Sequence, residues 1–504
     1  MKTICLTAAA VVAFAACGNS QQRAAGTAGA FSTVRRADGV TARYFAAGDP
    51  FLEAGYRLSA EYWEKTAGPG EYMLRGAVDA FVPPVFQAMQ HEGADRMMRG
   101  FATSFFGAAA GTGLVPFAYD TRLEDGTQTG GRQPVQMIDA AMRFVRWFPR
   151  DTDIQRRARA MGDATLRSFD RPGGGVYGWA VASTGRPEIP RVYTAKLAAA
   201  LDGMEALSEA TGDPRYARWA MGKLAWVRGM RGPGTTLVCG DFTITARVPV
   251  DNGKCDTDLL YLTQRVYAIA RRNGDAGLRA WALGDTEAWM TGGWLARPGH
   301  FARKLYPNGT PAVTTLYGDG KYNTLAVLVD GYRATRDARY LARLKTAWRG
   351  LRAMGRDGLA PEMVENGRMV QSRGLDPSQT IFLQILVDAY VVSGDREFLD
   401  LARELGTAIL RHGRSAMRMD SGQAGDAFVR LGLASAQVHR VEVALPAGGA
   451  RVTVVQGGRT MVDVAGPGAA AVVYLVPGVA TLRTAGGARV VSDRVIALRT
   501  TSAD

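Results

Sequence analysis

Residues Tyr193–Val227 read YTAKLAAALDGMEALSEATGDPRYARWAMGKLAWV, and this stretch holds the unit from which the fold is built. Its first half is apolar nearly all round, as in a buried helix. The turn TGD at Thr211–Asp213 ends that helix, and a helix with a charged face follows at once. The stretch therefore predicts a helical hairpin that buries its first helix and exposes its second.

Five further turns of this kind divide the chain into similar units. They read GAD at Gly93–Asp95, PRD at Pro149–Asp151, NGD at Asn273–Asp275, TRD at Thr335–Asp337 and SGD at Ser393–Asp395. Successive aspartates lie about 60 residues apart, a period that suits one hairpin and a return loop. Such repeats bury their apolar faces only against their neighbours. Six of them predict a mainly α fold, an (α/α)6 toroid whose first helices wall a central cavity.

The N-terminal end carries an export signal. Residues 1–16 combine a charged start, a short apolar run and small residues, as secretory signal peptides do. Cys17 follows Ala15 and Ala16 and resembles the cysteine of a bacterial lipoprotein box, which is lipidated after cleavage. We expect a lipid-anchored protein of the bacterial cell envelope, on the outer membrane or the periplasmic face. An ordinary signal peptide cut near the same place is the alternative.

The remaining division of the chain follows from composition and periodicity. From 438 onward, short segments with a two-residue period are broken by Gly-Gly and Pro-Gly pairs, which predicts a small antiparallel β-sandwich. We expect a flexible tether at 17–33 and then an N-terminal extension at 34–76, which contains one helix near 50–66. The barrel catalytic domain is expected at 77–414, a linker at 415–437 and the sandwich at 438–504.

Two cysteines, Cys239 and Cys255, remain once the signal and the lipidated cysteine are set aside. An even pair in an oxidising compartment predicts a disulfide. It would close a loop of about 15 residues and stabilise the fold by about 3 kcal/mol. Two unpaired thiols are the alternative.

The formal net charge of +14 comes mostly from arginine, which a GC-rich genome also produces without selection for binding. An acidic polysaccharide and a neutral substrate therefore both stay open. Nucleic acid is not expected, because no stripe of basic and aromatic residues is present. We expect neither metal nor cofactor, because the sequence has no phosphate or dinucleotide motif and no metal-binding spacing among its four histidines, His91, His300, His412 and His439.

The long returns between units are where binding groups are expected to gather. They open at the same end as the N-termini of the buried helices and comprise 169–191, 231–254, 292–320 and 355–377. In repeat architecture and helix texture, residues 77–414 with the β-rich tail resemble the six-hairpin glycosidase superfamily, the (α/α)6 barrels of many glycoside hydrolases and related polysaccharide lyases. The resemblance implies a carbohydrate-active enzyme with its cleft at the long-loop end.

Hydrolysis of a glycosidic bond needs two carboxyl groups, one protonated and one ionised. Asp256 and Asp258 open the fourth buried helix in the stretch CDTDL, although an aspartate in the place of Asp256 is often only an N-cap. We expect Asp258, with Asp256 as a further candidate, to take part in cleaving a polysaccharide or oligosaccharide, which is possibly one that contains uronate. Partner carboxylates in neighbouring loops are expected among Asp120, Asp125, Asp319 and Glu362.

A basic and aromatic loop offers a second chemistry. Lyases acting on uronates neutralise a carboxylate and remove the neighbouring proton with residues such as His and Tyr. His300 with Tyr306 or Tyr322 fits this β-elimination, so a polysaccharide lyase is the alternative, and a non-catalytic glycan-binding lipoprotein is the third hypothesis. The expected substrate contacts are Arg191, Tyr193, Arg303, Tyr306, Tyr317, Lys321, Asn323 and Arg373.

Overall fold

The computed structural model describes the chain in segments. They are 31–35, 41–45, 49–65, 92–109, 111–117, 130–189, 194–229, 237, 254–297, 299–318, 320–417, 421–435, 439–444, 451–456, 459–466, 470–475, 480–485, 489–492 and 498–502. The expectations for the signal peptide and for Cys17, Asp120, Asp125, Arg191, Tyr193, Cys239 and Asp319 fall outside these residues.

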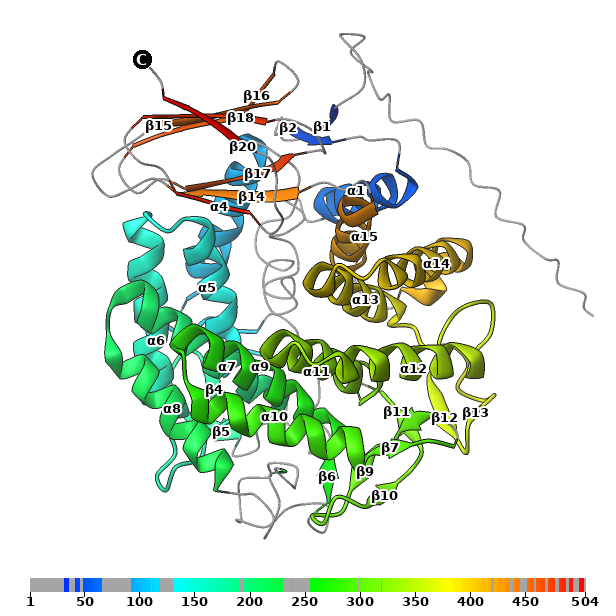
Figure 1. Ribbon diagram of the computed structural model, residues 1–504. Helices are drawn as coiled ribbons and strands as arrows, with labels where there is room; N and C mark the ends of the chain where they lie inside the picture. The colour runs from blue at the N-terminus through cyan, green and yellow to red at the C-terminus, as the bar shows by residue number, and fades with distance from the viewer. Residues whose placement is uncertain are drawn as a thin grey trace, which may run out of the picture.

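Helices packed side by side form a ring, which Figure 1 shows curving from α5 through α9 and α11 to α13. The apolar first helix of each unit lies on the inner side, as predicted, because neighbouring first helices bury one another's apolar faces. These inner helices are α5 (Met137–Trp147), α7 (Thr194–Thr211), α9 (Leu260–Asn273), α11 (Gly320–Thr335), α13 (Gln379–Ser393) and α15 (Ser421–Ser435).

The outer helices begin at the predicted aspartates. In five of them, an aspartate side chain accepts a hydrogen bond from a backbone N–H of the first turn. The five aspartates are Asp151, Asp213, Asp275, Asp337 and Asp395. They cap α6 (Thr152–Phe169), α8 (Pro214–Arg228), α10 (Ala276–Thr291), α12 (Ala338–Met354) and α14 (Arg396–His412), respectively.

The sixth predicted turn is wrong. Gly93–Asp95 lies inside the first turn of α4 (Glu92–Gly107) rather than before it. Acidic residues are favoured in the first turn of a helix as well as at its cap, because the N-terminal end of the helix dipole is positive. The sequence pattern alone does not separate these two positions.

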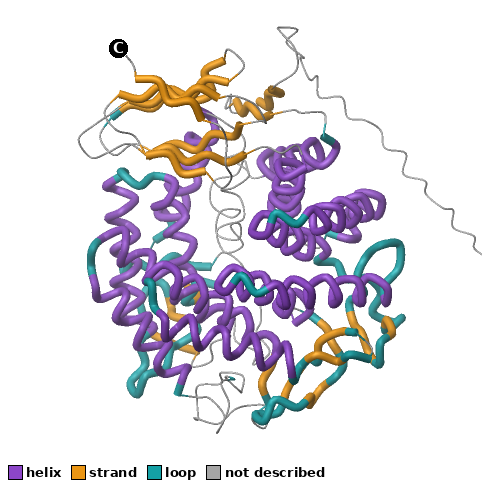
Figure 2. Tube along the Cα trace, viewed as in Figure 1, coloured by secondary structure: helices purple, strands orange, loops and turns teal. Residues whose placement is uncertain are grey.

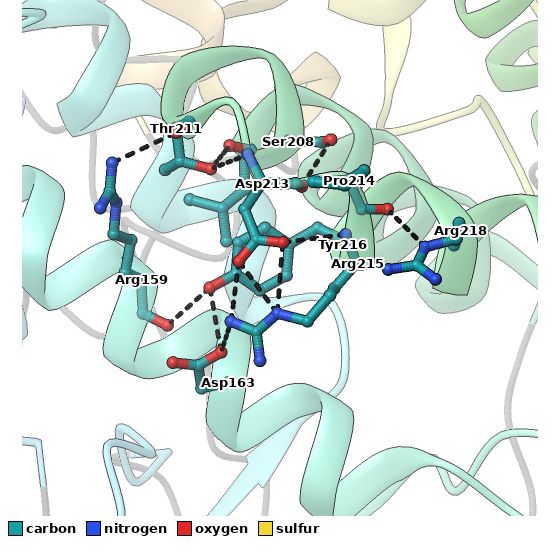
Figure 3. A network of polar contacts seen from close by, with 10 residues as sticks. Arg159, Asp163, Ser208, Thr211, Asp213, Pro214, Arg215, Tyr216 and Arg218 are labelled. Atoms are coloured by element: carbon teal, nitrogen blue, oxygen red, sulfur yellow. Dashed lines mark hydrogen bonds and ion pairs between the residues drawn. The ribbon is translucent and has the colours of Figure 1, made fainter.

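The turn between α7 and α8 shows how one hairpin is held (Figure 3). The Asp213 carboxylate accepts from the Arg215 backbone N–H at 2.9 Å, and the Ser208 hydroxyl donates to the Asp213 carbonyl at 2.8 Å. The Arg215 guanidinium and the Tyr216 hydroxyl both reach Asp163 of α6, each at 3.0 Å. The aspartate thus ties the turn internally, and the residues after it tie this hairpin to the preceding one.

The first described helix closes the ring against the last. Helix α1 (Pro50–Lys65), predicted near 50–66, packs along α15. A Cβ added to Gly55 would lie 2.6 Å from the Val429 backbone nitrogen, and one added to Gly432 would lie 2.7 Å from the Leu52 backbone. The prediction of a linker at 415–437 is therefore wrong, because most of this segment forms α15. Its Gly432 permits close packing against α1.

Two short strands precede α1. They are β1 (Phe31–Arg35) and β2 (Thr41–Phe45), which pair antiparallel. The last residues of the predicted tether at 17–33 are therefore part of a β-hairpin.

The C-terminal residues form two small sheets, shown together at the top of Figure 2. The β-sandwich prediction is confirmed except for one pairing, because β20 joins β18 in parallel rather than antiparallel. One sheet has the order β17 (Ala470–Leu475), β14 (His439–Ala444), β19 (Arg489–Ser492). The other has the order β16 (Arg459–Ala465), β15 (Arg451–Gln456), β18 (Ala480–Ala485), β20 (Leu498–Ser502).

Short strands also brace the long returns, and they gather along the lower edge of Figure 1. Each belongs to a segment that leads from an outer helix to the next inner helix, so the long-loop end of the ring is ordered by backbone pairing. One sheet joins β3 (Arg132–Pro134), β4 (Trp179–Val181) and β5 (Pro187–Ile189). The others are formed by β6 (Cys255–Asp256), β9 (Lys304–Leu305) and β10 (Pro311–Val313), by β7 (Trp294–Leu295) and β8 (His300–Phe301), and by β11 (Leu316–Tyr317), β12 (Met363–Glu365) and β13 (Arg368–Met369).

Candidate functional site

An arginine at the long-loop end collects several of the predicted site residues. Strands β6 and β9 pair antiparallel, which places Asp256 opposite Lys304 and brings Arg303 beside the start of the fourth inner helix. The short 3-10 helix Thr257–Leu259 leads from β6 into α9, and the Thr257 backbone N–H donates to the Arg303 carbonyl at 3.1 Å. Backbone pairing between two distant loops therefore builds the cluster.

The Arg303 guanidinium is almost fully engaged by this cluster. Its two terminal nitrogens donate to the two oxygens of Asp258 at 2.9 and 2.6 Å, a bidentate ion pair. One of them also lies 3.1 Å from Asp256 Oδ1, and the other donates to the Thr257 hydroxyl at 2.9 Å. The Tyr317 ring lies over the guanidinium at 4.7 Å. These contacts use the planar fork of arginine in a way that lysine cannot reproduce.

Asp256 is an anchor within the cluster. Its Oδ1 accepts from the Asp258 backbone N–H at 3.0 Å, and its Oδ2 lies 3.3 Å from Lys304 Nζ. The N-cap interpretation is therefore confirmed. Burial raises the pKa of the Asp256 carboxyl, the Arg303 charge opposes this rise, and the neighbouring Asp258 charge adds to it.

Asp258 is the accessible carboxylate of the cluster. Its side chain is 49% exposed, whereas that of Arg303 is only 7% exposed. The guanidinium thus holds the carboxylate from the protein side and leaves its other side open to a ligand. Arg303 itself was expected to contact substrate, but its enclosed position makes it a residue that orients Asp258.

The start of α11 packs directly against this cluster. A Cβ on Gly320 would lie 2.2 Å from the Thr257 hydroxyl and 2.4 Å from the Arg303 guanidinium, so only glycine fits there. The next residue, Lys321, is completely buried and pairs with Asp376 at 2.6 Å. It also donates to the Glu362 carbonyl. The expectation that Lys321 contacts substrate is wrong, since its ammonium group ties two long loops together.

The remaining predicted substrate contacts are scattered. Asn323 is buried, and its side-chain oxygen accepts from Gln264 at 3.5 Å. Tyr306 is 45% exposed in the turn after β9, and Arg373 is exposed in the loop before α13. None of these three makes a recorded hydrogen bond or ion pair to the Arg303 cluster within the described segments. Only Tyr317 does contact it.

The residues of the predicted lyase site do not combine by hydrogen bonding. His300 is buried on β8, with Nδ1 2.8 Å from the Phe301 carbonyl and Nε2 without a hydrogen-bond partner. Burial lowers the pKa of His300. Tyr322 packs edge-on against Phe382 with 6.1 Å between ring centroids. His300 therefore has no hydrogen bond to Tyr306 or Tyr322.

Of the two cysteines of the predicted disulfide, Cys255 lies within the described residues. Cys255 is buried at the start of β6, next to Asp256. Because Cys239 lies outside the described residues, its pairing with Cys255 stays a prediction. Among the described residues there is no helix long and apolar enough to cross a membrane, and no group of three or more potential ligand residues placed to hold a metal ion.

A second group of charged residues, which the sequence patterns above do not predict, lies on the inner helices. An aspartate followed by glycine or alanine occurs in five of the six inner helices, and α9 contributes Arg265. This repeated Asp-Gly or Asp-Ala pair is the signal that could have revealed them. We call the six residues the inner belt: Asp139, Asp202, Arg265, Asp330, Asp388 and Asp426.

Contacts between neighbouring helices link several members of the belt. Arg265 on α9 donates to Asp202 on α7 at 3.1 Å. The charge of Asp139 on α5 also helps to raise the pKa of Arg265, although α7 stands between α5 and α9 in the ring. A Cβ on Gly203 would lie 2.7 Å from the Asp139 backbone nitrogen, so α5 and α7 meet at the level of their belt aspartates.

Asp330 is a belt residue whose pKa is strongly shifted by its surroundings. Burial raises the pKa of its carboxyl to about 6, and the charge of Asp388 contributes to the rise. Arg333 on the same helix and Arg271 and Arg265 on α9 oppose it. At neutral pH, the folded protein therefore carries this carboxylate at a cost.

We expect the variant Asp330→Asn to be more stable than the native protein above pH 6 and to show no gain near pH 4. The folded state holds the Asp330 proton more tightly than the unfolded chain, whose aspartates have a pKa of about 4. Stability from this group is present below about pH 4 and is lost as the pH rises through about 6, by at most about 3 kcal/mol. Urea unfolding across this range measures the difference. A gain that is the same at every pH would contradict it, and Asp400→Asn on an exposed site of α14 is the matched control.

Comparisons with known proteins support the fold. No family model and no curated protein matches the sequence. Among solved structures, the α-1,2-mannosidase from Trichoderma reesei is 14% identical with a TM-score of 0.56, covering 76% of this chain and 92% of its own. The cellobiose 2-epimerase from Bacillus thermoamylovorans B4167 is 10% identical with a TM-score of 0.50, covering 71% and 97%. At these identities the likeness concerns the arrangement of the helices.

Proposed function

We propose that this chain, whose fold is the (α/α)6 barrel of the six-hairpin glycosidase superfamily, is a carbohydrate-active enzyme that hydrolyses glycosidic bonds with Asp258 as its principal carboxylate. The substrate is a polysaccharide or oligosaccharide. The protein is exported through residues 1–16 and anchored by a lipid on Cys17. The substrate and the anchor are parts of the same proposal.

One observation carries the proposal. Asp258 is half exposed at the long-loop end of the ring, is held by both arms of a buried guanidinium, and has a second carboxyl group, Asp256, beside it on the same guanidinium nitrogen. Hydrolysis requires a protonated and an ionised carboxyl group with environments that separate their pKa values. Burial raises the pKa of Asp256, which is the direction that an acid needs, while Arg303, Lys304 and the Asp258 N–H hold its oxygens in place. The oriented, accessible Asp258 fits the base or nucleophile.

The two alternative functions have less support from the geometry. Uronate elimination would need His300 to act with a tyrosine, and His300 is buried with its hydrogen bond made to a backbone carbonyl. A non-catalytic glycan-binding protein would not need the bidentate orientation of a half-exposed carboxylate. The hydrolase is therefore the function that these contacts favour.

A substrate panel tests the function. Mass spectrometry of the exported protein should identify a lipidated Cys17 as its N-terminal residue. The same protein is then incubated with acidic and neutral polysaccharides. Reducing ends and ultraviolet absorbance are followed together. New reducing ends without a rise in absorbance are the expected result. A rise in absorbance would mean unsaturated uronates and a lyase, and binding without any new ends would favour the glycan-binding alternative.

A further inference from the structure

A buried lysine at the start of α11 lies directly behind the Arg303 cluster. Lys321 is 0% exposed, and its ammonium group contacts the Asp376 carboxylate at 2.6 Å. The residue before it, Gly320, packs so closely against the Arg303 guanidinium that no Cβ fits between them. Replacing a buried ion pair by apolar residues of similar volume is often neutral or stabilising. The stability of the fold alone therefore does not account for a charged pair in this position.

The pair anchors the long loop 355–377. The Asp376 backbone N–H donates to the Ala360 carbonyl at 2.9 Å. The completely buried Gln379 side chain pairs with the same backbone in both directions. Its Oε1 accepts from the Ala360 N–H at 3.1 Å, and its Nε2 donates to the Ala360 carbonyl at 2.7 Å. The first and last parts of the loop are thus held together.

The same lysine fixes the position of the neighbouring sheet. Lys321 also donates to the Glu362 carbonyl, one residue before β12 begins at Met363. Strand β12 pairs with β11, which places Met363 opposite Tyr317. Figure 1 shows these strands at the lower edge of the ring, beside β9 and β10. The position of Tyr317 therefore depends on the anchored loop.

Tyr317 contacts Arg303 in two ways. Its ring lies over the guanidinium at 4.7 Å, and its carbonyl accepts from Nη1 at 3.3 Å. The same guanidinium donates to both oxygens of Asp258. A continuous series of contacts therefore runs from the buried ion pair through β12 and β11 to the half-exposed carboxylate.

We propose that the buried residues Lys321, Asp376 and Gln379 are positioning residues for the proposed reaction. They keep the ring of Tyr317 over the guanidinium that orients Asp258. The inference rests on the proposed function and extends it to residues that act through others. A reacting group must be held close to its productive geometry, and a displacement of about 1 Å can lower a rate by about 10²-fold. Interior residues with fixed side chains supply this precision.

Hydrogen exchange of the full chain tests the positioning without any substrate. The backbone N–H groups of Thr257 and Asp258 are both hydrogen-bonded beside Arg303. In Lys321→Met, we expect these two amides to exchange at least tenfold faster than in the native chain. Leu224→Ala removes a buried side chain from α8 and is the matched control for lost stability. It should leave the exchange of both amides unchanged.

Kinetics on the substrate that the panel identifies give the second readout. Lys321→Met should lower kcat by about 10- to 100-fold with little change in KM. The double variant Lys321→Met with Asp376→Leu removes the uncompensated charge but leaves the Glu362 carbonyl without its donor. We expect this double variant to regain stability while kcat stays low. Gln379→Met removes both hydrogen bonds to Ala360 and no charge, and it should lower kcat in the same way.

Three results would overturn the inference. They are a native kcat in a folded Lys321→Met variant, a kcat that recovers together with stability in the double variant, and equal acceleration of exchange in Lys321→Met and Leu224→Ala. Failure of the proposed function looks different. Selective acceleration at Thr257 and Asp258, with no polysaccharide hydrolysed by the native chain, would support the positioning role and contradict the hydrolase.

Discussion

Replacing Asp258 by asparagine is expected to lower kcat/KM on the substrate that the panel identifies by about 10²- to 10⁴-fold, the usual contribution of a positioned acid–base group. Asparagine keeps the size of the side chain and one oxygen that can still accept from Arg303. It removes the ionisable carboxylate, which is half exposed at the long-loop end. Steady-state kinetics on purified, folded variant measures the effect.

Controls separate chemistry from positioning. Asp400→Asn makes the same chemical change on the exposed side of α14 and should leave kcat/KM unchanged. Arg303→Lys keeps the positive charge but loses the bidentate grip on Asp258, so kcat should fall while KM changes little. Activity of Asp258→Asn within threefold of the native enzyme would exclude Asp258 as a catalytic residue.

Replacing Lys321 by methionine is expected to reduce the free energy of unfolding by about 3–5 kcal/mol, the effect of breaking a buried ion pair from one side. Lys321 is completely buried, and its partner Asp376 is 5% exposed at 2.6 Å. Methionine fills much of the same space but leaves the Asp376 carboxylate in the interior without its counter-charge. Urea denaturation followed by circular dichroism measures the change.

An exposed ion pair in the same protein provides the comparison. Lys345 contacts Asp395 at 2.6 Å and Glu397 at 2.5 Å, but both carboxylates are more than a third exposed. Lys345→Met should therefore cost less than about 1 kcal/mol. The double variant Lys321→Met with Asp376→Leu should recover part of the loss, since it removes the uncompensated charge. A similar cost for the two lysine variants would show that burial of Lys321 is not what makes it important.

The helical hairpins could be predicted because their signals are local. An aspartate at the start of each outer helix and a glycine at the end of an inner helix act through nearest-neighbour backbone geometry. Gly274 and Gly394, for example, end α9 and α13 in the left-handed conformation that favours glycine. Helix α15 is not predicted, because its signal depends on a contact that is distant in sequence. Its glycines serve this close contact with α1.

The candidate site was predicted as residues but not as an arrangement. Asp256, Asp258, Arg303 and Tyr317 were each named, yet their meeting depends on the pairing of β6 with β9 across two loops. The burial of Lys321 is not predicted, because lysine is rarely buried. The inner belt is not predicted, because a single aspartate in an apolar helix carries little weight alone. Its meaning comes from the same position recurring around the ring.

The contact between α1 and α15 has a consequence for folding of the chain during its synthesis. A chain leaves the ribosome N-terminus first at about 5–20 residues per second, so α1 waits for tens of seconds before its partner is made. During that interval, the apolar side chains of Phe51 and Leu52, both buried in the finished ring, have no α15 to cover them. If the chain is exported as proposed, it crosses the membrane unfolded, before the ring can close. The ring then closes only in the compartment to which the chain is exported, where α15 packs against α1.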